Sequence, residues 1–342
     1  MKARISPLAI ALVLASGSAA AAQWQALPET APAPADNPTT PAKVELGKML
    51  YFDPRVSSTG TVSCFSCHNV MEGGDDHRPT SIGVHGQVGG RNAPTVWNAA
   101  FHSSQFWDGR AATLEDQAKG PVTNPIEMGM SDLHAAVARL TKIGGYKSYF
   151  DAAFGPGDNI TADNMAKAIA AYERTQITPN SPYDRYVKGD AKALNAQQVR
   201  GMETFAAVGC TTCHAGPNFD GPALPMGQPF LMKFPTFTGS AYEAKYGLSE
   251  DLGRYATTKN DADKHMWRVP TLRNLPYTAP YFHNGSVKSL PEAVKVMAKV
   301  QLDKDLGEKE TADIVAFLEA LTGEFPDQTM PHLPPTPGDL LE

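Results

Sequence analysis

The sequence predicts a mainly α-helical protein built from two domains, with long loops that contain many Gly and Pro residues. The chain has 342 residues, of which 42% are hydrophobic, so it is long enough to bury two ordinary cores. Apolar residues recur at helical spacing in several segments, whereas long alternating strand patterns are missing. A short sequence unit also occurs twice, which indicates an internal repeat.

The first residues have the composition of an export signal. Lys2 and Arg4 precede an apolar stretch, and the small residues that follow fit an Ala-x-Ala cleavage site. A membrane anchor is the alternative, but this stretch is too short to span hydrocarbon and no later stretch is long enough. We therefore expect residues 1–22 to be a signal peptide, and the mature chain to begin near Gln23 in a bacterial periplasm.

The charge pattern excludes some classes of partner. The formal net charge is −6, and no run of like charges is present. Nucleic acids and anionic membrane surfaces are usually bound by clustered basic residues. We therefore expect no nucleic-acid partner, and the short apolar stretches predict no membrane span.

Caps and apolar stripes place several helices along the chain. In "TADNMAKAIAAYERT", Thr161 is a candidate N-cap, and Met165, Ile169 and Tyr172 lie on one helical face. Comparable stripes are Leu133, Val137 and Leu140 after a Ser131 cap; Val199, Met202 and Ala206 after an Asn195 cap; Leu290, Val294 and Met297 after a Ser289 cap; and Ile314, Leu318 and Leu321 before Gly323.

Turn-forming residues divide the chain into regions. The stretch "TPNSPYDRYVKGD", residues 178–190, interrupts the helical pattern and predicts a domain boundary. The predicted regions are a Pro-rich N-terminal segment (23–43), two domains (44–182 and 183–324) and a Pro-rich tail (325–342). Because the two terminal regions are poor in apolar periodicity, we expect them to be extended or loosely attached.

All four cysteines belong to two Cys-x-x-Cys-His units. A thioredoxin-like redox pair is one alternative, but the His directly after each second Cys argues against it. A four-ligand zinc site is another, but the two pairs are much farther apart in the sequence than those of zinc ribbons. The units are "VSCFSCHNV", with Cys64, Cys67 and His68, and "VGCTTCHAG", with Cys210, Cys213 and His214.

The spacing of these units predicts two covalently attached haem c groups. Positions i and i+3 share one face of a helical turn, so two thiols can add to the vinyl groups of one porphyrin, and the following His supplies an axial nitrogen. The residues before each unit repeat as well, with Gly47 and Phe52 in the first copy and Gly201 and Phe205 in the second. We therefore expect two cytochrome c-like domains, each wrapped around one haem.

The ligand on the far side of each iron decides whether a haem only transfers electrons or also reacts. For the second haem the leading candidate is Met297, although a methionine in an apolar helical stripe is usually a core residue. For the first haem it is His85, which lies in a glycine-rich loop that could move a ligand off the iron. The competing residues are Met226, Met232 and Met266 for the second haem, and His77 and His102 for the first.

Two longer stretches extend the pattern. "RNAPTVWNAAFHSSQFWDGRAATLEDQAKGPVTNPIEMG" and "VPTLRNLPYTAPYFHNGSVKSLPEAVKVMAKVQL", together with both haem units, resemble the bacterial di-haem cytochrome c peroxidases. The resemblance runs from about Glu45 to Gly323. It implies a periplasmic enzyme that reduces hydrogen peroxide to water with electrons from a small cytochrome c or a cupredoxin. Members of this family commonly dimerise, so the resemblance also implies a homodimer.

The same resemblance implies how the two haems are held. The N-terminal haem is the low-potential, peroxidatic one, with His68 as proximal ligand and His85 as removable distal ligand. The C-terminal haem is the high-potential one that receives electrons, and it is held by His214 and Met297. In many relatives reduction of this second haem releases the distal His, whereas other relatives are active when fully oxidised. The loop "HGQVGGRN" permits such a release.

Three residues are implied to act in the reaction. Glu127 in "NPIEMG" matches the distal acid-base group, Gln117 in "EDQA" lies beside it, and Trp107 in "FWDGR" matches the tryptophan between the haems. Without the resemblance, Glu127 reads as an ordinary turn carboxylate and Trp107 as a core aromatic.

A calcium ion between the domains is implied as well. Asn92 matches a ligand through its side chain, and Thr278 and Pro280 match ligands through their backbone carbonyls. A hard cation that is held by a few protein oxygens and several waters is physically reasonable.

Two other classes of function remain open from the sequence. A plain di-haem electron carrier would need neither Glu127 nor Gln117. A related di-haem enzyme oxidises tryptophans of a partner protein to a quinone cofactor, but such enzymes have a Tyr where Met297 stands.

Overall fold

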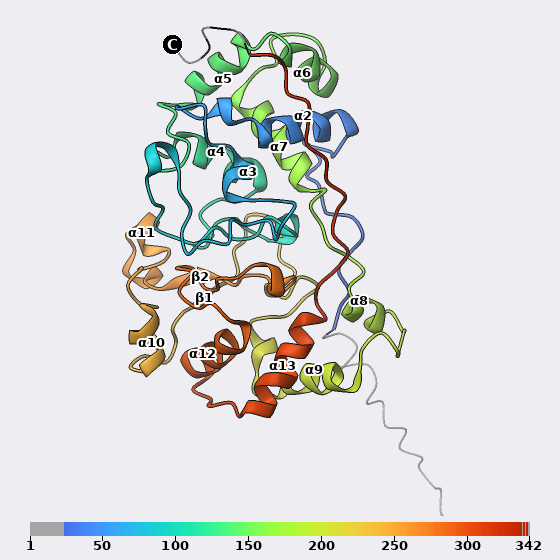
Figure 1. Cartoon of the computed structure of the whole chain (residues 1–342), viewed down its shortest axis with the longest axis vertical. Helices are drawn as coiled ribbons and strands as arrows, with labels where there is room; N and C mark the ends of the chain where they lie inside the picture. Colours follow the sequence, from blue (N-terminus) through green and yellow to red (C-terminus); the bar gives the residue numbers. More distant parts are fainter. Residues whose placement is uncertain (1–23, 337, 339, 341–342) are drawn as a thin grey trace, which may run out of the picture.

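The computed structural model describes residues 24–336, 338 and 340, so the expected signal peptide lies outside the described residues. The chain forms an elongated molecule in which the first half of the sequence lies above the second half in the view of Figure 1. The predicted mainly α-helical fold is confirmed. Within the part of the chain that the structure describes, no helix is long and apolar enough to cross a membrane.

The helices and strands follow the two halves of the sequence. The first half contains α2 (Pro41–Phe52), α3 (Cys64–Cys67), α4 (Leu114–Thr123), α5 (Leu133–Lys142), α6 (Tyr146–Phe154) and α7 (Ala162–Glu173). The second half contains α8 (Pro182–Val187), α9 (Ala196–Val208), α10 (Ala241–Tyr246), α11 (Tyr255–Thr258), α12 (Leu290–Leu302), α13 (Glu308–Glu319) and the antiparallel strands β1 (Leu231–Lys233) and β2 (Met266–Arg268).

The predicted helix caps are largely confirmed. Thr161 and Asn195 accept hydrogen bonds from backbone N–H groups in the first turns of α7 and α9, and Ser289 directly precedes α12. The predicted cap at Ser131 is wrong, because α5 is capped by the side chain of Asp132. Ser and Asp are equally good caps, so adjacent candidates cannot be separated by their residue type.

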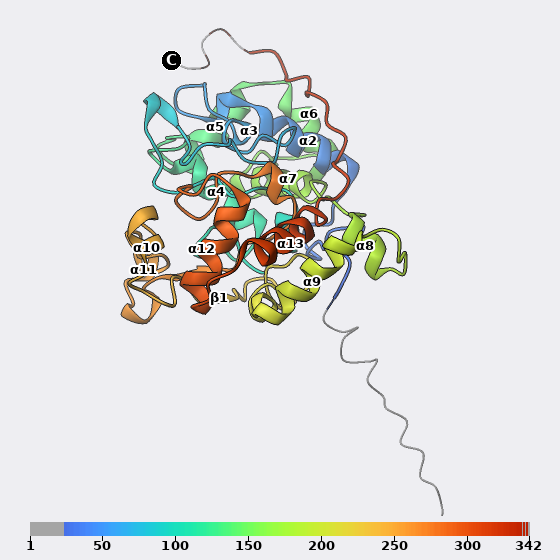
Figure 2. The same ribbon diagram turned by 60° about the horizontal axis from the view of Figure 1, so that its bottom comes forward.

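Each half is organised around one pair of crossing helices, α2 with α7 and α9 with α13. Figure 2 shows α9 lying against α13 in the second half. At both crossings a glycine lets two backbones touch. A Cβ on Gly47 would lie 1.8 Å from the carbonyl oxygen of Ala168, and a Cβ on Gly201 would lie 1.8 Å from that of Asp313. The predicted internal repeat therefore consists of two equivalent helix crossings.

Aromatic side chains pack beside each crossing, but in a register that differs from the predicted one. The rings of Phe205 and Phe317 are 5.4 Å apart, and the equivalent pair in the first half is Tyr51 and Tyr172, at 5.2 Å. Counted from the glycine, Tyr51 rather than Phe52 corresponds to Phe205. The sequence offered two adjacent aromatic residues, and the packing of the partner helix selects between them.

The predicted apolar face of α9 is wrong. Val199, Met202 and Ala206 are only partly buried, whereas the buried residues of this helix are Gly201, Phe205 and Val208. The close approach of α13 at Gly201 determines which face of α9 turns inward. The buried apolar residues form two separate main clusters, one between Leu46 and Tyr172 and one between Tyr183 and Leu321.

A buried polar junction joins the two halves at Thr178. Asn98 and Asn274 are fully buried, and both adopt the left-handed conformation, with φ of 64° and 60°. The Nδ2 groups of both donate to Thr178 Oγ1 at 2.8 Å. Thr178 N donates to Asn98 Oδ1 at 2.9 Å, and Gly323 N donates to Asn274 Oδ1 at 3.2 Å. One residue of the connecting segment is thus held by an asparagine from each half.

The N-terminal segment is extended, but the expectation that it is loosely attached is wrong. Trp24 packs against Tyr183 and Phe317 of the second half, with ring distances of 6.2 and 5.9 Å. The segment then crosses to the first half, where Asn37 is fully buried and donates to Glu115 at 2.6 Å. This segment therefore connects both halves.

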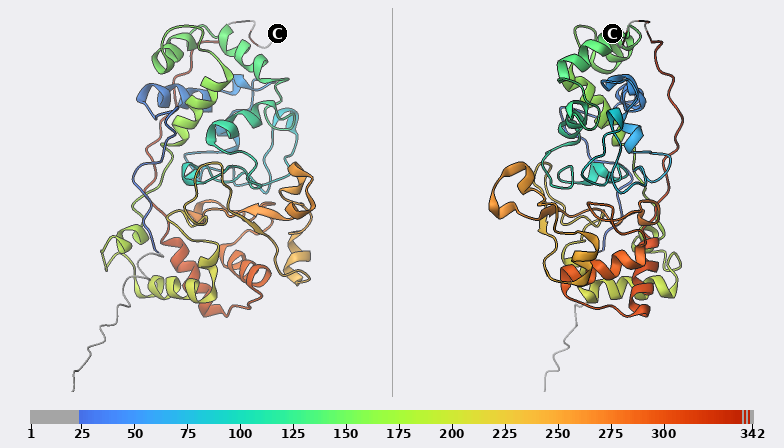
Figure 3. Two further views of the ribbon diagram at one scale, coloured as in Figure 1. Left: turned by 180° about the vertical axis from the view of Figure 1, so that it is seen from behind. Right: turned by 60° about the vertical axis from the view of Figure 1, so that its left-hand side comes forward.

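The C-terminal tail connects the halves in the same way. Phe325 stacks on Trp97 at 4.6 Å, and Arg55 Nη1 donates to Pro334 O at 2.8 Å. Leu340 is buried among the apolar residues of the first half. Figures 1 and 3 show both terminal segments running along the same side of the molecule. Pro-rich composition predicted their extended shape, but their attachment depends on partners that are remote in the sequence.

Replacing Thr178 tests the junction between the halves. Thr178→Val removes the hydroxyl acceptor at nearly constant shape and leaves two buried asparagine N–H groups without it, so we expect a loss of roughly 2 kcal/mol or more in unfolding free energy. Urea unfolding followed by circular dichroism measures this loss. Thr178→Ser keeps the acceptor and should retain most of the stability. Equal stability of the Val variant and the parent protein would contradict this role.

Candidate active site

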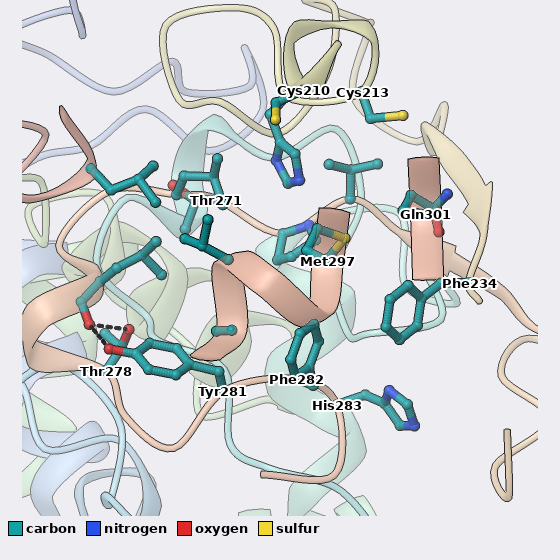
Figure 4. Close-up of a pocket in the computed structure, with 18 of the residues that line it drawn as sticks. Cys210, Cys213, Phe234, Thr271, Thr278, Tyr281, Phe282, His283, Met297 and Gln301 are labelled. Atoms are coloured by element: carbon teal, nitrogen blue, oxygen red, sulfur yellow. Dashed lines mark hydrogen bonds between the residues drawn. The ribbon is translucent and has the colours of Figure 1, made fainter. Parts of the chain in front are cut away.

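A large cavity in the second half is lined by the second Cys-x-x-Cys-His unit. Cys210, Cys213 and His214 line it together with Met297, which projects from α12. Figure 4 shows the two cysteines at one edge of this space and Met297 facing it from the helix. Four residues that the sequence assigned to one haem are thus brought together around one cavity.

The ring of His214 is oriented by a second contact. Its Nδ1–H donates to Phe219 O at 2.8 Å, which leaves the Nε2 lone pair available to a metal. Burial lowers the pKa of His214, so that the imidazole is neutral at pH 7. The neutral ring is the form that coordinates iron.

The cysteines have none of the properties of a redox pair. Burial raises the pKa of Cys67 to about 11 and that of Cys210 to about 12, and it also raises the pKa of Cys64 and Cys213. Reactive Cys-x-x-Cys pairs instead have lowered pKa values. All four thiols are unpaired. These observations argue against the thioredoxin-like alternative and suit thiols that are consumed by covalent attachment of a cofactor.

The structure narrows the choice among the methionines. Met297 and Met232 both line the cavity, whereas Met226 and Met266 do not. All three residues of the apolar stripe to which Met297 belongs line the cavity; Leu290 is also buried in the apolar cluster of the second half, whereas Val294 and Met297 are only partly buried. The interpretation of Met297 as an ordinary core residue is therefore not supported.

The first Cys-x-x-Cys-His unit lies on and just after α3. His68 is partly buried beside the backbone of Gly74 and Pro94, and the loss of solvent around its ring lowers its pKa. His214 has the backbone of Pro270 in the equivalent place. Tyr51 of α2 donates its hydroxyl to His68 O at 2.8 Å. Helix α2 thus helps to hold the histidine that follows the first cysteine pair.

Glu127 lies close to this first unit. Its carboxyl group is near enough to Cys64 and Cys67 to raise the pKa of both thiols. Burial raises the pKa of Glu127 itself, against the opposing effects of Arg110 and of Asn124, whose Nδ2 donates to Glu127 Oε1 at 2.7 Å. The predicted acid-base residue is therefore a partly buried carboxyl group beside the first haem unit.

Gln117 lies within α4, and Glu127 lies in the turn that follows this helix. Both side chains are partly buried. The turn is held by backbone hydrogen bonds from Glu127 N to Asn124 O and from Met130 N to Val122 O. The same local segment therefore positions both of the residues that were predicted to act on the substrate.

His85 lies at the tip of a narrow hairpin. Gly89 N donates to Ser81 O at 2.8 Å and Gly83 N donates to Gln87 O at 2.9 Å, while His85 itself is exposed and has a φ of 58°. The hairpin is attached to the Glu127 segment, because Val84 N donates to Glu127 O at 2.9 Å. The loop that carries His85 is therefore anchored at the buried Val84, while the next residue, His85, is exposed.

The two other candidates for the ligand of the first haem, His102 and His77, lie in environments that differ from that of His85. His102 is buried, its ring contacts the carboxylate of Asp220, and it lines the cavity of the second haem unit. His77 is partly exposed, with its Nδ1 3.2 Å from Asp75 Oδ1. The location of His102 beside the second unit does not suit a ligand of the first haem.

Trp107 belongs to the first half of the chain but lines the cavity of the second. Its Nε1–H donates to Asn92 O at 2.9 Å, and its own carbonyl accepts a hydrogen bond from Arg268 N at 2.8 Å. The indole is therefore fixed by backbone contacts at the junction of the halves.

The residues that were predicted to bind calcium line the same cavity. Asn92, Thr278 and Pro280 are joined there by Asp75, which the sequence had not indicated. Asp75 is 1% exposed, and its Oδ1 accepts no hydrogen bond from a described residue, although His77 Nδ1 lies 3.2 Å away. Among the described residues no cluster of three His, Cys, Asp or Glu side chains could hold a metal. A cation here would depend mainly on amide and carbonyl oxygens, which suit calcium.

A second internal repeat was missed from the sequence. Residues 93–109 and 269–285 align without gaps, and both end in an isolated antiparallel bridge, Gln105 with Ala111 and Tyr281 with Val287. The residues that "APTVWN" and "VPTLRN" share are the sequence signal that could have revealed this repeat. The aligned pairs with positive φ are Asn98 and Asn274, Phe106 and Phe282, and Gly109 and Gly285.

The comparisons with known proteins agree with this architecture. The family model described as di-haem cytochrome c peroxidase matches residues 41–192. The cytochrome c551 peroxidase of Pseudomonas aeruginosa is 45% identical over 317 residues, which covers 92% of this chain and 88% of that protein. The protein of the same name from Nitrosomonas europaea is 42% identical over 308 residues, with 90% and 88% covered.

One solved structure, a MauG-like protein associated with microbial copper homeostasis, has a TM-score of 0.75 at 30% identity and covers 87% of this chain and 95% of that one. The di-haem peroxidase BthA from Burkholderia thailandensis shares the fold, with a TM-score of 0.66 at 22% identity and 84% and 87% covered.

The chain belongs to the di-haem cytochrome c peroxidase family. The predictions of this family and of a peroxidase enzyme are thereby confirmed. Membership implies two haem c groups, and the two Cys-x-x-Cys-His units fit that number.

Proposed function

We propose that this peroxidase acts in the periplasm, where it reduces hydrogen peroxide to water with electrons from a small cytochrome c or a cupredoxin. The observation that carries the proposal is the difference between the two haem units. The first has a partly buried carboxyl group, Glu127, close to its cysteines, whereas the second has the thioether of Met297 in an apolar cavity. One unit suits proton transfer and the other suits electron storage.

At the first site, Cys64, Cys67 and His68 would hold a haem, which would supply electrons for cleavage of the O–O bond of hydrogen peroxide. Glu127 would accept a proton from one oxygen of the peroxide and return it to the other, which leaves as water. Burial raises the pKa of Glu127, which makes it a better proton acceptor than an exposed carboxylate, and Asn124 keeps it oriented. Gln117 orients the peroxide by hydrogen bonding.

His85 is the removable distal ligand in this proposal. Its hairpin is hydrogen-bonded to the Glu127 segment through Val84, the buried residue directly before His85, whereas His85 and the residues after it as far as Val88 are exposed. A change of backbone conformation at His85 would therefore move its side chain while Val84 and Glu127 stay in place. Gly86, directly after His85, permits that change.

At the second site, Cys210 and Cys213 would attach the haem, and His214 and Met297 would bind its iron. Thioether ligation raises a haem potential, which suits the group that receives electrons. Trp107 lies between the cavity and the first half of the chain, as an electron path requires.

The location, the donor and a homodimer are parts of the same proposal. The signal-like N-terminus supports export, and the cytochrome c551 peroxidases among the relatives support a small cytochrome as donor. A net charge of −6 suits a basic donor. The alternatives are less well supported: a plain electron carrier has no use for Glu127, and enzymes that form a quinone cofactor have a Tyr where this chain has Met297.

Replacing Glu127 tests the acid-base role. Because the carboxylate form accepts the proton, turnover of the parent enzyme should fall as the pH is lowered through the raised pKa of Glu127. Glu127→Gln should lose this pH limb and about 100-fold or more of kcat, as is typical for a missing acid-base group. Steady-state peroxide assays between pH 4 and about 8 measure both effects.

The matched control is Asp116→Asn, which removes an exposed carboxylate from α4 and should leave turnover unchanged. Mass spectrometry must show two haems in each variant. Near-normal activity of a fully loaded Glu127→Gln enzyme would exclude the proposed role.

Two leucine variants test which of the two methionines that line the cavity binds the iron. Leucine keeps the apolar volume but has no sulfur to bind iron. Met297→Leu should lower the potential of the C-terminal haem and produce a high-spin signal, whereas Met232→Leu should do neither. Optical redox titration and electron paramagnetic resonance measure these properties. The reverse pattern would identify Met232 as the ligand.

Calcium is proposed at Asn92, Thr278 and Pro280, with Asp75 nearby. Asn92 Nδ2 donates to Arg78 O at 2.8 Å, which turns the amide so that its oxygen can bind a cation. Dialysis against a chelator should lower the thermal midpoint, and calcium should restore it. Asn92→Ala should retain less calcium per chain by elemental analysis. An unchanged calcium content would show that the ion, if bound, lies elsewhere.

A further inference from the structure

Arg268, on β2, lines the cavity of the second haem unit and plays no part in the proposed reaction. It is 4% exposed, and within the described residues it forms no ion pair with a carboxylate. It is also the one lysine or arginine among the described residues that line this cavity. A buried and unpaired positive charge is costly, so such a group is usually kept for a partner anion.

The guanidinium is held in place but not neutralised. Its Nε donates to Phe106 O at 3.1 Å and its Nη1 donates to Val269 O at 3.1 Å, and Nη2 forms no hydrogen bond to a described residue. Burial lowers the pKa of Arg268 to about 10, which still leaves the group charged at neutral pH.

The nearest carboxylates are already engaged with other groups. Asp220 contacts the ring of His102 and accepts a hydrogen bond from Asn218 Nδ2 at 3.0 Å. Asp108 forms ion pairs with Arg91 at 2.8 Å and with Arg110 at 3.0 Å. Both acids influence Arg268 from a distance, but neither forms a salt bridge with it.

The haem that is expected in this cavity has negatively charged substituents. A haem carries two propionates on the edge opposite the vinyl groups, and Cys210 and Cys213 fix the vinyl edge at one end of the cavity. The remaining wall is mostly apolar and includes residues such as Phe234, Val294 and Leu318. A carboxylate in such surroundings requires a cation or several hydrogen-bond donors.

We propose that Arg268 binds a propionate of the C-terminal haem through its free Nη2 group. The inference rests on the proposed attachment of that haem at Cys210, Cys213 and His214. It assigns Arg268 as a positioning residue that orients the haem and tunes its potential.

This contact would also connect the haem to the junction of the halves. Arg268 N donates to Trp107 O at 2.8 Å, and its Nε donates to the carbonyl of the preceding residue, Phe106. A propionate bound to Arg268 is therefore joined by hydrogen bonds to the segment that carries Trp107. A cation beside the haem disfavours the added positive charge of the ferric state, so Arg268 raises the reduction potential.

Three variants test the proposal by the potential of the C-terminal haem. Arg268→Gln removes the charge and should shift the potential downward, whereas Arg268→Lys keeps the charge and should shift it less. Arg254→Gln removes the same charge from a side chain that donates to Asp108 O and Gly109 O but does not line the cavity, so it should leave the potential close to that of the parent. Optical redox titration of each variant gives the potential.

Measuring the haem content by mass distinguishes an error in the inference about Arg268 from an error in the proposed haem attachment on which it rests. If the parent protein carries no haem at Cys210 and Cys213, the proposed function is wrong and Arg268 has no propionate to bind. If both haems are present and Arg268→Gln leaves the potential unchanged, the inference about Arg268 is wrong. Should the Gln variant not fold, a crystal structure of the loaded parent decides: a propionate within hydrogen-bond distance of Arg268 supports the proposal, and a guanidinium turned away from both propionates overturns it.

Discussion

The shared hydroxyl of Thr178 is the contact on which the arrangement of the two haem units depends. Asn98 and Asn274 bind it from opposite halves, and each begins a loop that runs to the interface, where one loop carries Trp107 and the other His283. Both asparagines adopt the left-handed backbone conformation, which few residues other than glycine tolerate. Asparagine therefore meets the backbone requirement and also supplies the side-chain hydrogen bonds to Thr178. Because the hydrogen bonds are fully buried, a relative movement of the halves would leave polar groups unsatisfied.

Other contacts hold the helices within each half and join the two halves along one side. Direct backbone contact at Gly47 and Gly201 holds one helix pair in each half, and the two terminal segments bind both halves along one side. Glu127 and His85, which are proposed to react or to change position, lie in a turn and a loop outside these helices. The His85 hairpin shows the principle, since Val84 is hydrogen-bonded to the Glu127 segment while His85 itself is exposed. Functional loops on a rigid scaffold can move without unfolding it.

The two haem units differ mainly in the charges placed near them. The first has the carboxyl group of Glu127, whose pKa is raised by burial, and the second has a mostly apolar wall in which Arg268 is the one lysine or arginine among the described residues. A negative group favours the oxidised haem and a positive group favours the reduced haem. The same duplication therefore produces one site that suits proton transfer and another that suits accepting electrons, with Trp107 between them.

The sequence by itself determined the features that depend on neighbouring residues. The caps at Thr161 and Asn195 and the glycines of the repeat are local patterns, and each was predicted correctly. The two Cys-x-x-Cys-His units are local patterns as well, and their number agrees with the two haems that the family implies. Only the tertiary structure decided the inward face of α9, the choice of Tyr51 over Phe52, the attachment of the Pro-rich ends and the place of Arg268 in the cavity. These depend on which remote backbone or side chain lies opposite, because burial and charge compensation are properties of contacts between distant parts of the chain.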